Sequence, residues 1–198
     1  MRTAVVFDLE FTAWEGSMAH HWLRPGEFRE VVQIGAVRLD AGSLEEVATF
    51  DAFIRPRINP VLSEYFERLT GITNADVKRE GRDFAAAFAA FLAFSEGAAW
   101  FAFGRDDLVL RDNCRLYGLG SPPFPEFYDA RPWFRANGVD TRGLHSCNIG
   151  PKLGVPLNGR KHNALTDARS VAAGMKVLVA RGAKSLFSGM DAAARTAA

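Results

Sequence analysis

The segment FDLEFT places two carboxylates two positions apart at the end of an apolar strand. Successive side chains of a strand point to opposite faces, so Asp8 and Glu10 share one face while Phe7 and Leu9 share the other. Two like charges on a half-buried surface repel each other and cost stability. A divalent cation would offset that cost most directly, because Mg²⁺ and Mn²⁺ prefer hard oxygen ligands. The alternative is that the strand ends at Phe7 and that both acids are solvated loop residues.

Composition indicates a globular protein of ordinary domain size. With 198 residues, 48% of them hydrophobic, the chain can build a sizeable core. The formal net charge of +1 is no argument for or against a nucleic-acid partner, so any basic surface must be local. Two distant cysteines indicate neither a disulfide framework nor a zinc cluster. Without a signal-peptide pattern or an apolar run of membrane length, we expect a soluble cytoplasmic protein.

Hydrophobic periodicity predicts an α/β domain over residues 1–182. Three apolar segments predict an antiparallel meander, and helical and strand patterns then alternate, which predicts a mixed sheet flanked by helices. The expected strands are 2–11, 31–40, 47–56, 98–105 and a short one within 124–134, with a long loop at 12–30. The expected helices are 62–71, 82–97, 106–118, one begun by Pro132, a helix or turn at 146–158, and 164–182. Residues 183–198 are expected to form a tail that is helical or frayed.

A second acidic position lies in WFAFGRDDLVL, where an apolar strand ends at Gly104 and a helix begins at Asp106 or Asp107. Either acid could be an ordinary cap or first-turn residue of that helix. Asp106 is the better candidate for a site, because the residues three and four positions ahead, Val109 and Leu110, are both apolar. That spacing places Asp106 near the helix face that packs on the sheet.

A third acidic position lies in HNALTD, at the start of the last long helix. Asn163 is a plausible N-cap, which places Asp167 in the first turn, four residues before Val171 and near the buried face. His162 lies just outside the helix. A single Asp in a first turn also has an ordinary explanation, since helix N-termini favour anions.

Taken together, these acids and the histidine resemble the motifs of the DEDDh group of 3′-to-5′ exonucleases, which includes proofreading subunits and ribonuclease T. The first motif of that group, Asp-x-Glu, matches Asp8 and Glu10. The single acid of the second motif is best matched by Asp106. The third motif, His-x-Ala-x-x-Asp, matches His162 and Asp167 without a gap.

The resemblance covers residues 3–180. EVVQIGAVRLD and FIRPRINPVLSEYFERLTGIT look like the strand, Pro-containing loop and LTGI helix that often follow the first motif. The long first loop and the FGRDD segment look most like the branch of histone-mRNA and small-RNA exonucleases and their bacterial relatives. The resemblance implies a ribonuclease H-like fold, in which three antiparallel strands lead into parallel ones.

The resemblance also implies two bound divalent ions, Mg²⁺ or Mn²⁺. Asp8 would bridge both ions, Glu10 and Asp167 would complete the water-binding ion, and Asp106 would support the second. His162 would act as general base, because an imidazole pKa near 6.5 suits proton transfer near neutral pH.

Substrate contacts are less clear from the sequence. In relatives the residues after Asp-x-Glu contact the terminal nucleotide, so Phe11 and Thr12 are candidates; alternatively, Phe11 continues the apolar strand face. Four basic residues near the motifs are either phosphate contacts or solvated charges: Arg105, Lys152, Arg160 and Lys161.

We therefore expect a metal-dependent 3′-to-5′ exonuclease acting on the 3′ ends of single-stranded nucleic acid. RNA is favoured over DNA, although no motif encodes recognition of the 2′-hydroxyl. The alternatives are a phosphodiesterase for dinucleotides or other small molecules and a catalytically weak nucleic-acid binding module. No membrane partner is expected. The Phe-rich helix is a candidate surface for a homodimer. A partner protein is a candidate for selecting the target nucleic acid.

Overall fold

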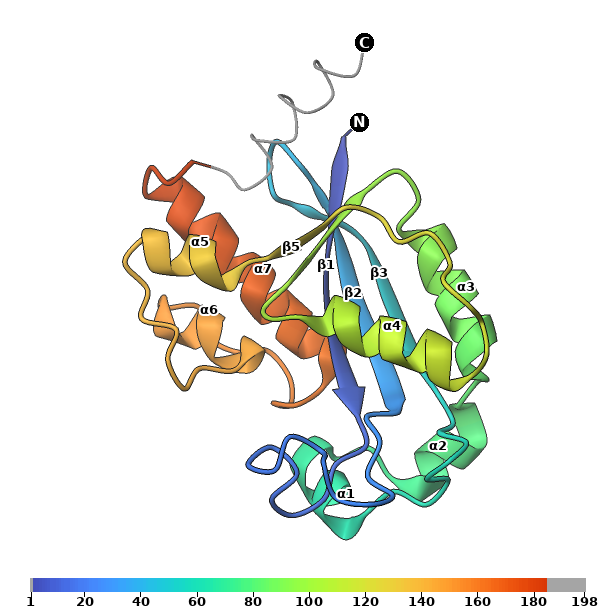
Figure 1. Ribbon diagram of the computed structural model, residues 1–198. Helices are drawn as coiled ribbons and strands as arrows, with labels where there is room; N and C mark the ends of the chain where they lie inside the picture. Colours follow the sequence, from blue (N-terminus) through green and yellow to red (C-terminus); the bar gives the residue numbers. More distant parts are fainter. Residues whose placement is uncertain (1, 185–198) are drawn as a thin grey trace.

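The computed structural model describes residues 2–184, so residues 185–198 of the expected tail lie outside the described part of the chain. Within that part, five strands form one mixed sheet in the order β3-β2-β1-β4-β5 (Figure 1). β1 pairs antiparallel with β2 and parallel with β4. The strands are β1 (Thr3–Phe11), β2 (Val31–Asp40), β3 (Glu46–Phe53), β4 (Ala99–Ala102) and β5 (Phe127–Asp129). The predicted mixed sheet, with its leading antiparallel meander, is confirmed.

Helices flank both faces of the sheet. α1 (Glu64–Thr70) is followed by Gly71, whose φ of 76° makes it a left-handed C-terminal cap. α2 (Asn74–Glu80) is not predicted from hydrophobic periodicity, although Thr73 and Asp76 form a capping box at its start. The other helices are α3 (Phe84–Phe94), α4 (Asp106–Leu116), α5 (Arg131–Ala136), α6 (Ile149–Lys152) and α7 (Ala164–Ala180). None of the described helices is both long and apolar enough to cross a membrane.

The side chains of β1 alternate between two cores. Its odd-numbered side chains pack with those of α3 and α4, whereas the even-numbered Ala4 and Val6 pack in the core formed with α5 and α7. Asp8 and Glu10 continue the even-numbered row, and both are buried. The strand runs on to Phe11, so the two acids are strand residues and not solvated loop residues.

Candidate active site

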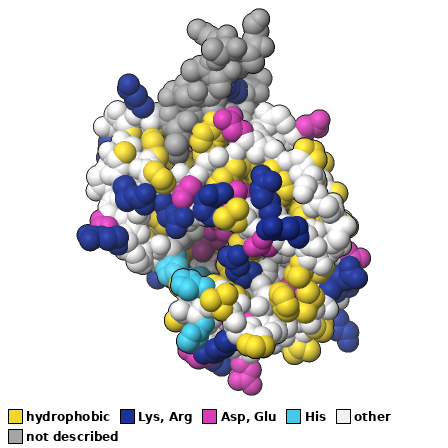
Figure 2. Space-filling model, in the orientation of Figure 1, with side chains coloured by type: hydrophobic (Ala, Val, Ile, Leu, Met, Phe, Trp, Pro, Cys, Tyr) yellow, Lys and Arg dark blue, Asp and Glu magenta, His cyan; other side chains and the backbone are white. Residues whose placement is uncertain are grey.

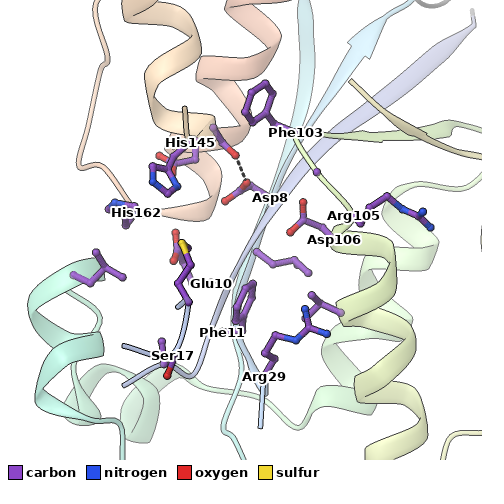
Figure 3. Close-up of a pocket in the computed structure, with 18 of the residues that line it drawn as sticks. Asp8, Glu10, Phe11, Ser17, Arg29, Phe103, Arg105, Asp106, His145 and His162 are labelled. Atoms are coloured by element: carbon purple, nitrogen blue, oxygen red, sulfur yellow. Dashed lines mark hydrogen bonds between the residues drawn. The ribbon is translucent and has the colours of Figure 1, made fainter. Parts of the chain in front are cut away.

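Four carboxylates reach one pocket from three elements (Figure 3). Asp8 and Glu10 lie near the end of β1. Because β1 and β4 are parallel, Asp106, which begins α4 shortly after β4, arrives at the same edge of the sheet. Asp167 comes from the first turn of α7. The pocket has a volume of about 630 Å³ and is also lined by His162.

The two acids of the Asp106–Asp107 doublet have different surroundings. Asp106 lines the pocket, and its burial, assisted by the charge of Asp8, raises the pKa of Asp106 well above its usual range. Asp107 is also buried, but it does not line the pocket. Both of its oxygens accept hydrogen bonds from Arg105, at 2.8 Å from Nε and 2.9 Å from Nη2. The structure therefore brings Asp106, and not Asp107, to the other acids.

The neighbouring strand β2 seats the first turn of α7 against the sheet. Gly35 lies opposite Asp8 in the β1–β2 register. A Cβ atom on Gly35 would lie only 2.0 Å from the backbone nitrogen of Leu165, so the close approach of α7 requires glycine at this position. Two residues earlier, Oε1 of the buried Gln33 accepts a 3.0 Å hydrogen bond from the backbone N–H of Ala164. These contacts fix the start of α7, and with it Asp167.

Burial and mutual repulsion shape the charges of the acid cluster. Burial, assisted by the charge of Asp167, raises the pKa of Asp8 to about 8. Burial and the neighbouring acids raise the pKa of Glu10 well above its usual range. The pKa of Asp167 rises to about 7 through burial, which outweighs a backbone hydrogen bond from His162. Without a cation, the cluster therefore retains protons near neutral pH.

The donor set fits a divalent cation. Glu10, His162 and Asp167 can each offer one ligand atom, and these atoms lie within 4.8 Å of one another. Oδ1 of Asp167 is buried without a hydrogen-bond partner among the described residues. Buried acceptors normally have a hydrogen-bond partner. A buried carboxylate oxygen without one, beside other acids, is suited to bind a divalent cation.

His162 occupies a strained turn before α7. Its φ of 57° lies in the left-handed region, which non-glycine residues adopt rarely and mostly where function or tight packing requires it. Its ring lies 5.7 Å from the ring of His145, edge to face. Burial first, and then the nearby positive charges, lower the pKa of His162, which keeps the imidazole neutral near neutral pH.

Two pocket residues are not singled out by the sequence pattern. The hydroxyl of Ser146 donates a 2.6 Å hydrogen bond to Oδ1 of Asp8, drawn as the dashed line in Figure 3. His145, the residue before it, faces the pocket beside His162. Both lie in the short turn that precedes α6, where no periodic or motif signal connects them to the first strand.

The predicted substrate contacts divide in the structure. Phe11 lines the pocket, and its ring centroid lies 5.3 Å from that of Trp22. Thr12 does not line the pocket: its buried hydroxyl donates to the carbonyl of Phe28 and accepts a 3.0 Å hydrogen bond from the backbone N–H of Glu30. The Thr12 side chain thus anchors the long first loop, and a contact of Thr12 with the terminal nucleotide stays a prediction.

The four candidate basic residues also divide. Arg105 lines the pocket, whereas Lys152, Arg160 and Lys161 do not. Arg160 instead donates a 3.0 Å hydrogen bond to the carbonyl of Arg68, just before the end of α1.

Comparisons with known proteins agree with this geometry. The family model described as Exonuclease, of the RNase T type, matches residues 5–175. Mouse 3′-5′ exoribonuclease 1 is 29% identical over 189 residues, an alignment covering 84% of this chain and 50% of the mouse protein. Human ERI1 exoribonuclease 2 is 33% identical over 195 residues, covering 85% of this chain and 27% of the human protein. The chain thus spans half or less of the length of these relatives.

A solved structure shares the fold. The nuclease domain of 3′hExo, a DEDDh family member whose crystal structure contains rAMP, superposes with a TM-score of 0.77 at 26% identity. That superposition covers 91% of this chain and 93% of the 3′hExo domain. The family match spans most of the chain, and the acids and histidine of the DEDDh motifs converge on one pocket. The chain therefore belongs to the RNase T family of exonucleases, in its DEDDh group.

Proposed function

We propose that this protein is a metal-dependent 3′-to-5′ exonuclease that acts on single-stranded nucleic acid, with RNA preferred over DNA. The observation that carries the proposal is the convergence of Asp8, Glu10, Asp106 and Asp167 on a pocket that also holds His162. The preference for RNA is supported by the names of the similar proteins, which are exoribonucleases, and by the rAMP in the similar 3′hExo structure.

The four carboxylates would hold the metal ions. Asp8 would bridge two ions, Glu10 and Asp167 would complete one site, and Asp106 would support the other. Bound there, Mg²⁺ or Mn²⁺ would activate the attacking water and stabilise the departing 3′ oxygen. The raised pKa values of Asp8 and Asp167 support this role, because a bound cation would offset the burial of their charges, and for Asp8 also the repulsion from Asp167, which otherwise favour the protonated forms.

His162 would accept the proton of the attacking water. Two observations support this role: its lowered pKa leaves a ring nitrogen free of a proton near neutral pH, and its ligand atom lies within 4.8 Å of those of Glu10 and Asp167, which would hold the water-binding ion. Hydrolysis adds water across the P–O3′ bond. It releases a nucleoside 5′-monophosphate and leaves a 3′-hydroxyl on the shortened strand.

Matched 5′-labelled RNA and DNA strands test the proposal. We expect a ladder that shortens from the 3′ end with Mg²⁺ or Mn²⁺, runs faster on RNA, and disappears with chelator or in Asp8→Ala. Release of nucleotides from dinucleotides alone would instead establish the small-molecule phosphodiesterase. Binding without release, by a folded and metal-loaded protein, would establish the binding module. The cytoplasmic location, the homodimer and the targeting partner stay predictions.

A further inference from the structure

The candidate active-site pocket has one basic side. Arg29, Arg105 and Arg131 line it, and they are the only Lys or Arg residues among its described lining. In Figure 3, Arg29 and Arg105 lie on the α4 side, across the acids from His145 and His162. Figure 2 shows Lys and Arg side chains gathered across the middle of this face, beside the histidines. A strand entering the pocket from the α4 side would therefore meet positive charge.

Asp107 connects the pocket to a further arginine outside it. Its buried carboxylate binds Arg105, and Nε of Arg111 lies 3.9 Å from its Oδ2. The Arg111 guanidinium lies 4.0 Å from the ring centroid of Phe124, and that of Arg105 lies 5.7 Å from the ring centroid of Phe127. A buried acid and two aromatic rings thus hold both guanidinium groups in place, at little further entropic cost on binding.

These paired arginines keep donors for a ligand. Arg105 uses Nε and Nη2 to bind Asp107, and Arg131 binds Asp129 with the same two atoms. Nη1 of Arg105 and Nη1 of Arg131 have no hydrogen-bond partner in the part of the chain that the structure describes. The hydrogen bond to Asp129 raises the pKa of Arg131, and the nearby carboxylate of Asp106 raises it further. One end of the set is therefore at the acid cluster and the other, Arg111, is on the exposed surface of α4.

We infer that Arg131, Arg105 and Arg111 form an arginine row that binds successive phosphates of a single strand and directs the strand outward along α4. This inference rests on the proposed function and adds a substrate class to it: strands of several nucleotides bind more tightly than dinucleotides. Guanidinium groups suit phosphate oxygens because their planar N–H donors match phosphate geometry. Phosphate contacts carry no sequence information, so the row serves any sequence.

Salt dependence of binding tests the row separately from catalysis. Binding of a labelled strand of about ten nucleotides is measured by fluorescence anisotropy in chelator, at several salt concentrations. The slope of log affinity against log salt is negative, and each lost phosphate contact reduces its magnitude by about 0.7. We expect a decrease of about 0.7 for Arg111→Gln and about 1.4 for Arg105→Gln/Arg111→Gln, with affinity falling roughly tenfold in the double variant.

Control measurements separate the arginine row from the proposed exonuclease activity. Arg79→Gln removes an arginine of α2 that is likewise paired with acids, Asp76 and Glu80, and should leave the slope unchanged. Hydrolysis of a dinucleotide in Mn²⁺ should be unchanged in Arg79→Gln, and in Arg111→Gln it should fall less than binding of the longer strand does. A wild-type slope in the double variant would overturn the row. A reduced slope magnitude in the double variant, together with a wild-type protein that hydrolyses neither the dinucleotide nor the longer strand, would support the row and overturn the proposed function.

Discussion

The hydroxyl of Ser146 donates a 2.6 Å hydrogen bond to Oδ1 of Asp8, and these two buried residues are 138 positions apart in the chain. The bond favours the charged form of Asp8 and so opposes the rise in pKa that burial causes. Ser146 is thus a positioning residue for the carboxylate that we expect to bridge two ions.

Ser146→Ala should weaken metal binding in a pH-dependent way. Loss of the donor raises the pKa of Asp8 further, and the retained proton then competes with the cation. We expect a several-fold loss of Mn²⁺ affinity by calorimetry at about pH 7, which narrows at about pH 9. Ser146→Thr keeps the hydroxyl and should bind like the wild type. Equal affinity of Ser146→Ala and wild type at about pH 7 would contradict this role.

Substitution by Asn should affect dinucleotide hydrolysis at Asp106 but not at Asp107. Asp106→Asn removes a predicted metal ligand, so dinucleotide hydrolysis should fall by about 100-fold or more. Asp107→Asn removes a partner of Arg105 and Arg111, so dinucleotide hydrolysis should persist while binding of longer strands weakens. The rates of dinucleotide hydrolysis by the two variants are measured in the same assay, and circular dichroism checks that both variants are folded. A larger loss of dinucleotide hydrolysis in Asp107→Asn would reverse the assignment.

Gly35→Ala should destabilise the protein. Its Cβ atom would meet the backbone of Leu165, and backbone atoms cannot yield as a flexible side chain can. Overpacking of this kind costs about 1–3 kcal/mol, which urea unfolding would measure. Gly42→Ala, in an exposed turn where the added Cβ meets only the Asp40 side chain, is the matched control. The contact of β2 with α7 would matter less than we claim if both variants unfolded alike.

In chelator, stability should fall as pH rises. The pKa values of Asp8 and Asp167 are raised from 3.8 to about 8 and about 7, so the folded state binds more protons than the unfolded state between these limits. Stability is therefore greatest below about pH 4 for these groups and is lost as pH rises through about 7 to 8. Thermal unfolding across this range should show a falling Tm that Asp8→Asn partly flattens. A wild-type Tm that rises through neutral pH, with the rise lost in Asp8→Asn, would contradict the raised pKa values.

The local sequence pattern predicts those features of the site that depend on residues close together in the chain. The alternation of β1 predicts the shared face of Asp8 and Glu10, and Asn163 is indeed the cap of α7, accepting a 3.1 Å hydrogen bond from the backbone N–H of Thr166. The choice between Asp106 and Asp107 rests on one helical position, and the contact of Asp107 with Arg105 is what separates them.

Contacts between distant segments are beyond such patterns. Ser146 reaches Asp8 only because the turn before α6 lies over the end of β1, and nothing in the local sequence SCN indicates this. Gln33 and Gly35 look like ordinary strand residues until α7 is placed against them. Thr12 follows the first motif closely in sequence, yet the bend into the long first loop turns its hydroxyl to Phe28.

Mn²⁺ binding to wild type and Asp8→Asn tests whether the four carboxylates form the metal centre. Paramagnetic resonance counts bound Mn²⁺ without depending on turnover, and Asn fills the volume of Asp without its charge. We expect two bound ions per wild-type chain and loss of tight binding in a folded Asp8→Asn variant, together with loss of 3′-end shortening. Equal Mn²⁺ binding by both proteins would contradict the claim that these acids form the metal centre.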